Sequence, residues 1–173
     1  MFFKRKDYIC TMKKKIEIPY EVHAIEELDG QDKLLMEAAR EATRRSYAPY
    51  SKFHVGAAAL LENGIVVTGT NQENVASPSG LCAERTTLFY ANSQYPDVPV
   101  VALAIASPDT EDILSPCGAC RQVMLETENR YGKPMRVLLC GAEEVIVVES
   151  AKSLLPFAFE NIPCHSEEQC DEE

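Results

Sequence analysis

The first strong hydrophobic pattern along the chain is helical. Between residues 32 and 47, apolar side chains recur at intervals of three and four, and charged side chains fill the opposite face. Asp29 or Gly30 is suited to begin this helix. Ala48-Pro49 is expected to end it, because a residue before proline avoids helical angles. The pattern predicts a helix with one buried side.

Residues 53–61 are apolar on both faces, which is typical of a central strand that is covered on both sides. An Asn-Gly pair at residues 63–64 favours a tight hairpin turn into a returning strand over residues 65–70. Residues 71–80 are polar and predict a loop. Further strands are predicted over residues 98–107, 135–140 and 144–149, and further helices over residues 82–92, 117–131 and 153–159.

This order of elements predicts an α/β protein, a three-layer α/β/α sandwich around a five-stranded mixed sheet. Alternation of strand, helix and strand implies crossover connections that cover both faces of a sheet. We expect one domain over residues 29–161. A partly basic extension over residues 1–28 precedes it, and an acidic tail over residues 162–173 follows it.

Composition narrows the possible partners. The chain is acidic, with a net charge of -10, and it has no stretch near the ~20 apolar residues that cross a bilayer. An acidic body repels phosphate backbones, so a small-molecule substrate is favoured over nucleic acid or a membrane surface. No apolar run follows the basic start, so we expect no signal peptide and a reducing, cytoplasmic location for the cysteines.

Two short runs at predicted helix starts combine thiols with a carboxylate: Cys-Ala-Glu-Arg at residues 82–85 and Ser-Pro-Cys-Gly-Ala-Cys at residues 115–120. Three thiolates, from Cys82, Cys117 and Cys120, with water in the fourth position, make up one type of catalytic zinc site in deaminases. In that arrangement Glu84 is not a ligand but moves protons. Helix starts carry partial positive charge, which favours thiolates.

Two other interpretations of the cysteines are open. Cys-x-x-Cys by itself also fits a redox dithiol or half of a structural zinc site. The redox interpretation leaves Cys82 and Glu84 unexplained. A structural site needs a fourth protein ligand, for which the chain offers histidines and Cys140, Cys10, Cys164 and Cys170.

Four blocks in sequential order resemble the small, homotetrameric cytidine deaminases. They are residues 50–58, Asn-Gln-Glu-Asn at residues 71–74, residues 82–86 and residues 115–122, and the resemblance runs from about residue 32 to residue 159. It implies hydrolytic conversion of cytidine and 2'-deoxycytidine to uridine and 2'-deoxyuridine, with release of ammonia. It also implies one zinc ion per subunit and active sites shared within a homotetramer.

The resemblance also implies roles for individual residues. Glu84 would transfer protons, and Arg85 would donate to cysteine sulfurs and offset the negative charge of three thiolates on zinc. Asn71 and Glu73 would hold the ribose. Phe53 would form an aromatic wall against the pyrimidine, and the backbone groups of Ala83 and Ser115 would contact the base. Phe159 would reach into a neighbouring subunit's site, with Phe157 as the competing choice for this role.

One position departs from the family's pattern. Ser77 stands where these deaminases usually have a tyrosine that lines the pocket between subunits. Two alternatives are therefore kept, a zinc deaminase for another amino-substituted nucleoside, such as a nucleoside antibiotic, and a non-catalytic zinc module. A polynucleotide deaminase is disfavoured, because the chain has Cys-Ala-Glu instead of His-x-Glu.

Overall fold

A six-stranded mixed sheet forms the centre of the protein, in the order β1-β6-β5-β4-β2-β3. The computed structural model describes residues 12–160. Strands β4 and β5 run parallel, and the other neighbouring strands run antiparallel. The strands are β1 (Glu21–Ala24), β2 (Gly56–Leu61), β3 (Val66–Thr70), β4 (Val100–Ala106), β5 (Arg136–Cys140) and β6 (Glu144–Val148).

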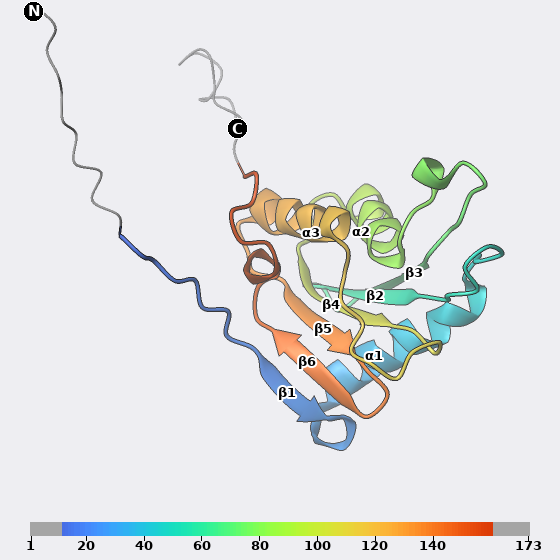
Figure 1. Ribbon diagram of the computed structural model, residues 1–173, viewed down its shortest axis with the longest axis horizontal. Helices are drawn as coiled ribbons and strands as arrows, with labels where there is room; N and C mark the ends of the chain where they lie inside the picture. Colours follow the sequence, from blue (N-terminus) through green and yellow to red (C-terminus); the bar gives the residue numbers. More distant parts are fainter. Residues whose placement is uncertain (1–11, 161–173) are drawn as a thin grey trace, which may run out of the picture.

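Helices cover both faces of the sheet. Helix α1 (Gly30–Ala42) lies on one face, and α2 (Ala83–Gln94) and α3 (Gly118–Tyr131) lie side by side on the other (Figure 1). The predicted three-layer α/β/α sandwich is confirmed. None of these helices is long and apolar enough to cross a membrane, within the part of the chain that the structure describes.

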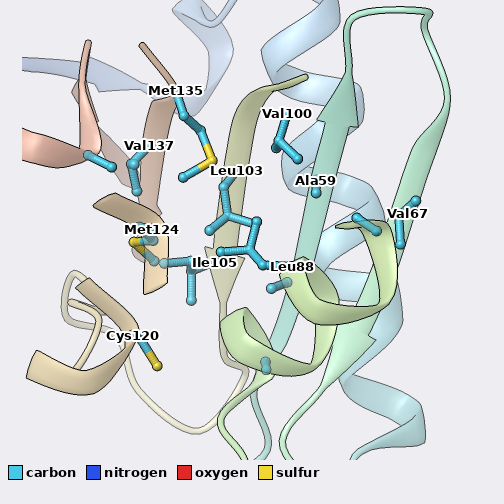
Figure 2. Packing of buried hydrophobic residues seen from close by; sticks show 14 of the residues in the cluster. Ala59, Val67, Leu88, Val100, Leu103, Ile105, Cys120, Met124, Met135 and Val137 are labelled. Carbon is cyan, nitrogen blue, oxygen red and sulfur yellow. The ribbon is translucent and has the colours of Figure 1, made fainter. Parts of the chain in front are cut away.

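Alternate residues of the central strands belong to two separate hydrophobic clusters, one on each face of the sheet. In β2, Ala57 and Ala59 pack under α2 and α3, whereas Ala58 packs under α1. This is the two-residue period of a strand buried on both faces. Figure 2 shows the first cluster, in which Leu88 of α2 and Met124 of α3 meet the sheet and Cys120 lies at the margin. The core therefore fixes the two helices at whose N-terminal ends the cysteines lie.

A glycine allows α2 to lie directly against β3. A Cβ atom at Gly69 would stand 2.5 Å from Thr87 Oγ1 and 2.9 Å from Thr87 N, closer than side-chain packing permits. Thr87 in turn donates from Oγ1 to the Ala83 carbonyl oxygen at 2.7 Å, within the first turn of α2. The start of α2 is therefore set close to the sheet.

The sheet has six strands and not the predicted five. The additional strand, β1, pairs antiparallel with β6, with Val22 opposite Ile146. Its four residues lie in the segment that the sequence assigned to an extension, and they are mostly exposed. An edge strand with little burial has no apolar alternation to reveal it.

Two predicted helix ends also differ from the structure. Helix α1 ends at Ala42 and continues only as a 3-10 turn over Thr43–Arg45, short of the predicted end at residue 47. The helix predicted over residues 153–159 is a 3-10 turn over Ala151–Leu154. Leu155 stands before a proline and leaves the helical region, and Phe157 has a positive φ of 56°. The segment that carries Phe157 and Phe159 is therefore not helical.

Candidate active site

The three predicted thiols meet at the starts of two helices. Cys82 is the N-cap residue of α2, Cys117 is the N-cap residue of α3, and Cys120 lies in the first turn of α3. The Cys82 and Cys117 sulfurs are 3.8 Å apart, and the Cys117 and Cys120 sulfurs are 3.4 Å apart. All three sulfur atoms lie within 4.8 Å of one another. The tertiary fold thus joins two thiols separated by 35 positions in the sequence.

This spacing fits a tetrahedral zinc ion. Zinc–sulfur bonds of about 2.3 Å place tetrahedral ligands about 3.8 Å apart. Within residues 12–160 the cluster consists of three cysteines, and Cys140 is buried at the end of β5 and does not belong to it. Cys10, Cys164 and Cys170 lie outside the described residues. Three ligands leave one coordination position open, which is the arrangement of a catalytic zinc site.

The pKa values of two of the thiols are shifted in opposite directions. A hydrogen bond with Cys120, and then those with Arg85 and Cys117, hold the pKa of Cys82 well below its ordinary value. The same contact with Cys82, and then burial, raise the pKa of Cys120. Zinc binds cysteine as the thiolate, so the lowered pKa of Cys82 suits this residue to ligate the ion.

Arg85 is the cation beside this cluster. Its Nη2 atom lies 3.7 Å from the Cys82 sulfur, and this contact raises the pKa of Arg85. Its buried Nε atom has no hydrogen-bond partner within the described chain. A guanidinium held against sulfur can offset the negative charge that three thiolates bring to a divalent ion.

Glu84 is buried in the first turn of α2, with 4% of its surface exposed. Burial, and then the charge of Cys82, raise its pKa above the ordinary value. A buried carboxyl group with a raised pKa, next to a site that can hold a metal ion, can both accept and donate a proton.

A hollow of about 720 Å³ opens beside Cys82 and Arg85. Two of its lining residues, Gln72 and Leu81, are joined by an isolated pair of backbone hydrogen bonds. Gln72 N donates to Leu81 O at 2.8 Å, and Leu81 N donates to Gln72 O at 3.0 Å. This bridge brings the residues after β3 next to the start of α2. The lining includes Tyr50, Ser51, Asn71, Glu73, Ser77, Cys82 and Arg85.

Glu73 is oriented by backbone donors. Its carboxylate accepts from Tyr50 N at 2.8 Å and from Ser51 N at 3.3 Å. Hydrogen bonds from Ser51 and from Tyr50 hold the pKa of Glu73 below its ordinary value. The group is therefore a charged acceptor at the wall of the hollow.

Asn71 is already engaged within the chain. Its Oδ1 atom accepts from Ser46 Oγ at 2.5 Å and from Val55 N at 2.8 Å, and its Nδ2 atom donates to Phe53 O at 2.8 Å. One Nδ2 proton remains for a ligand. Asn71 thus organises the segment before β2 as well as lining the hollow.

The other predicted contacts are spread around the site. Phe53 is half-buried and is tied to Asn71, whereas Ala83 is fully buried in the first turn of α2. Ser115 is exposed, two residues before Cys117. Phe159 does not line the hollow of its own chain. Its ring is exposed, and its carbonyl oxygen accepts from Gln122 Nε2 at 2.8 Å.

Sequence reasoning missed the residues that position the pocket through their backbones. The Tyr50 and Ser51 amides belong to a turn in which Lys52 has a positive φ of 60°. Every residue except proline has a backbone N–H, so the type of a residue does not reveal that its N–H positions a side chain. The turn-forming composition Pro-Tyr-Ser-Lys at residues 49–52 is the one sequence signal that could have indicated this turn. The contact between His54 and Asp109 was also not predicted, because it joins positions 55 apart.

Comparison with known proteins agrees with this site. Residues 29–131 match the family described as "Cytidine and deoxycytidylate deaminase zinc-binding region". The chain is 47% identical to a cytidine deaminase of Halalkalibacterium halodurans over 73% of its own length and 92% of the relative's. It is 44% identical to a cytidine deaminase of Sporosarcina psychrophila, over 74% and 90% of the two chains.

Solved structures are similar as well. The crystal structure of cytidine deaminase from Burkholderia pseudomallei superposes with a TM-score of 0.65 at 41% identity, covering 76% of this chain and all of that one. The enzyme from Mycobacterium tuberculosis superposes with a TM-score of 0.63 at 35% identity, covering 77% and 100%. The fold and the three-thiol site define a zinc-dependent deaminase. This chain belongs to the cytidine and deoxycytidylate deaminase family.

Proposed function

We propose that the protein is a zinc-dependent cytidine deaminase, which converts cytidine and 2'-deoxycytidine to uridine and 2'-deoxyuridine in pyrimidine salvage. The observation that carries this proposal is the cluster of Cys82, Cys117 and Cys120 beside buried Glu84, in a chain 47% identical to a curated cytidine deaminase. Zinc held by these thiolates would act as a Lewis acid that brings the pKa of a water molecule toward neutrality.

Glu84 would then perform the proton transfers. Its carboxylate would take a proton from the attacking water, deliver it to N3 of the base, and carry a further proton to the amine that leaves C4 as ammonia. Arg85 would offset the charge of the thiolates from its place against Cys82. The addition of water and the loss of ammonia are balanced without a further co-reactant.

Binding of the nucleoside would use the loops around the hollow. Glu73, fixed by backbone amides, would accept from a sugar hydroxyl, and the free Nδ2 proton of Asn71 would donate to one. Phe53 would pack against the pyrimidine. The Ala83 N–H and the Ser115 carbonyl would contact the base at O2 and at the amino group.

We also propose a homotetramer with shared active sites. Phe157 and Phe159 are 96% and 69% exposed on a segment that is tied down by Gln122, which favours a role outside their own subunit. A cytoplasmic location suits the site, because its three thiols must remain reduced to bind metal.

A direct assay tests the proposed activity. Purified protein with about one zinc per chain is expected to deaminate cytidine and 2'-deoxycytidine, measured by loss of ultraviolet absorbance. Glu84→Gln should keep its zinc and lose roughly 100-fold to 10,000-fold in kcat, since it removes the general acid–base group. Glu126→Gln, at an exposed position of α3, is the matched control and should keep full activity.

The assay also separates the alternatives. Turnover of 5'-phosphates or of an aminated nucleoside antibiotic in preference to cytidine would reassign the substrate, and Ser77 on the pocket wall makes that comparison worthwhile. Stoichiometric zinc without turnover of any of these compounds would leave a non-catalytic zinc module. A disulfide in place of zinc would contradict the deaminase.

A further inference from the structure

We propose that Asp109 and His54 form a latch that positions Phe53 against the loop carrying Ser115 and Cys117. The loop meant is residues 107–117, between β4 and α3, hereafter the metal loop. The latch is a positioning device and touches neither metal nor substrate. The inference rests on the proposed deamination of cytidine and adds two residues to it that the family pattern did not single out.

The peptide group between Phe53 and His54 is held at both edges. Asn71 Nδ2 donates to the Phe53 carbonyl oxygen at 2.8 Å, and the His54 N–H donates to Asp109 Oδ2 at 2.6 Å. A peptide group is planar, so fixing its oxygen and its N–H fixes the plane. The Phe53 Cα atom lies in this plane, so the same two bonds fix the point from which the side chain leaves the backbone.

The His54 side chain strengthens the link. Its ring Nδ1 atom lies 2.8 Å from the same Asp109 Oδ2 atom that accepts the backbone N–H. The backbone donor, and then the ring, hold the pKa of Asp109 below its ordinary value. The carboxylate is therefore a charged acceptor, and hydrogen bonds to charged acceptors are shorter and stronger than neutral ones.

Sheet pairing places the two loops at the same end of the molecule. Strand β2 begins at Gly56 and β4 ends at Ala106, and these two residues pair in the antiparallel register. Residues 53–55 and the metal loop therefore leave the sheet side by side, one residue beyond the last strand pair. The latch continues the strand contact with side-chain hydrogen bonds.

Two further hydrogen bonds hold the metal loop in place, so that Asp109 links the Phe53 segment to a fixed loop. The Glu111 carbonyl oxygen accepts from Ala142 N at 3.1 Å, and the Pro116 carbonyl oxygen accepts from Arg121 Nε at 2.9 Å. The loop is thus fixed near β6 and at α3, and Asp109 fixes it to the Phe53 segment. The Asp109 and His54 side chains are 33% and 38% exposed, so the pair contributes little to global stability.

Three single variants, a double variant and a control variant test the latch, with zinc content and melting temperature measured for each. Asp109→Ala removes both hydrogen bonds, Asp109→Asn keeps an acceptor oxygen, and His54→Ala removes only the ring contact. Asp112→Ala is the matched control, because Asp112 is exposed in the same loop. The readouts are kcat and KM for cytidine and the dissociation constant of uridine by calorimetry.

We expect Asp109→Ala to raise KM and the uridine dissociation constant roughly threefold to tenfold, with kcat within about twofold of wild type and zinc retained. His54→Ala and Asp109→Asn should have smaller effects, and Asp112→Ala none. The double variant His54→Ala/Asp109→Ala should be no worse than Asp109→Ala alone, because its members act through one contact. The latch would be overturned if the increases in KM caused by His54→Ala and by Asp109→Ala multiplied in the double variant. It would also be overturned if Asp109→Ala had the same KM and uridine dissociation constant as Asp112→Ala.

Amide hydrogen exchange separates failure of the latch from failure of the proposed function. The His54 amide should exchange faster in Asp109→Ala than in Asp112→Ala, and this readout needs no substrate. Faster exchange in a protein whose wild type does not deaminate cytidine overturns the function. Unchanged exchange in a protein that does deaminate cytidine overturns the latch.

Discussion

At the scale of single residues, the polar groups around the hollow are held by the chain before any ligand arrives. Asn71 accepts a hydrogen bond from Val55 N and donates one to Phe53 O. The Glu73 carboxylate accepts hydrogen bonds from the backbone N–H groups of Tyr50 and Ser51. Such bonds fix a side chain in place and lower the entropy lost on binding. A residue can therefore be a ligand for substrate and a support for its neighbours together.

Glu73→Gln tests the carboxylate in this arrangement. The glutamine amide keeps one acceptor oxygen, but its NH2 group would face the backbone N–H donors. Because hydrogen bonds to charged groups contribute about 1.5–3 kcal/mol, KM for cytidine should rise roughly tenfold or more. Steady-state kinetics measure it. Glu27→Gln, exposed next to β1, is the control, and an unchanged KM would remove Glu73 from the sugar site.

The pH dependence of sugar binding follows from the lowered pKa of Glu73. A carboxyl group with a depressed pKa stays charged above its ordinary value of about 4.3 and loses its charge only at lower pH. The contribution of Glu73 to cytidine binding should therefore be constant from pH 7 down to pH 5. The ratio of KM between Glu73→Gln and wild type, measured across this range, should stay flat.

At the scale of elements, a buried carboxylate joins three parts of the chain. Glu128, near the end of α3, accepts from Met135 N at 2.7 Å before β5 and from Ala151 N and Lys152 N, both at 2.9 Å, in the following 3-10 turn. Met135 is fully buried, so leaving its N–H donor without a partner would be costly. The same turn precedes Phe157 and Phe159, so Glu128 also fixes the base of that segment.

Glu128→Gln should therefore destabilise the fold. Its NH2 group would face N–H donors, and we expect the free energy of unfolding to fall by about 1–3 kcal/mol in urea titration. Glu126→Gln, two positions away and exposed, should change it little. Equal stability of the two variants would show that the Glu128 hydrogen bonds do not support the fold.

At the scale of the whole molecule, the proposed tetramer predicts complementation between inactive subunits. Phe159→Ala should reduce kcat/KM and keep zinc, because the ring would act in a neighbour's site. Mixing Phe159→Ala with Glu84→Gln subunits, after reversible dissociation, should restore activity, since some mixed sites receive both intact residues. Light scattering gives the mass, and absence of recovery in mixed tetramers would contradict shared sites.

The sequence by itself determined the elements and the chemistry that depend on local order. Apolar periodicity predicted α1 to α3 and five strands, and the two cysteine runs marked helix starts, because neighbouring residues determine both periodicity and capping. The sequence did not predict β1, which is an exposed edge strand. It also did not predict that the helix expected after Ser150 is a short 3-10 turn, because Pro156 and tertiary contacts outweigh the local helical pattern there.

Only the tertiary structure decided which distant groups meet. The 3.8 Å approach of the Cys82 and Cys117 sulfurs, the Asn71 bonds to the Phe53 segment and the contact of His54 with Asp109 all join residues far apart in the chain. These contacts depend on strand order and on the packing of α2 and α3 against the sheet. Hydrogen bonds act over about 3 Å, whereas a sequence pattern records only neighbours along the chain, so packing alone brings such partners together.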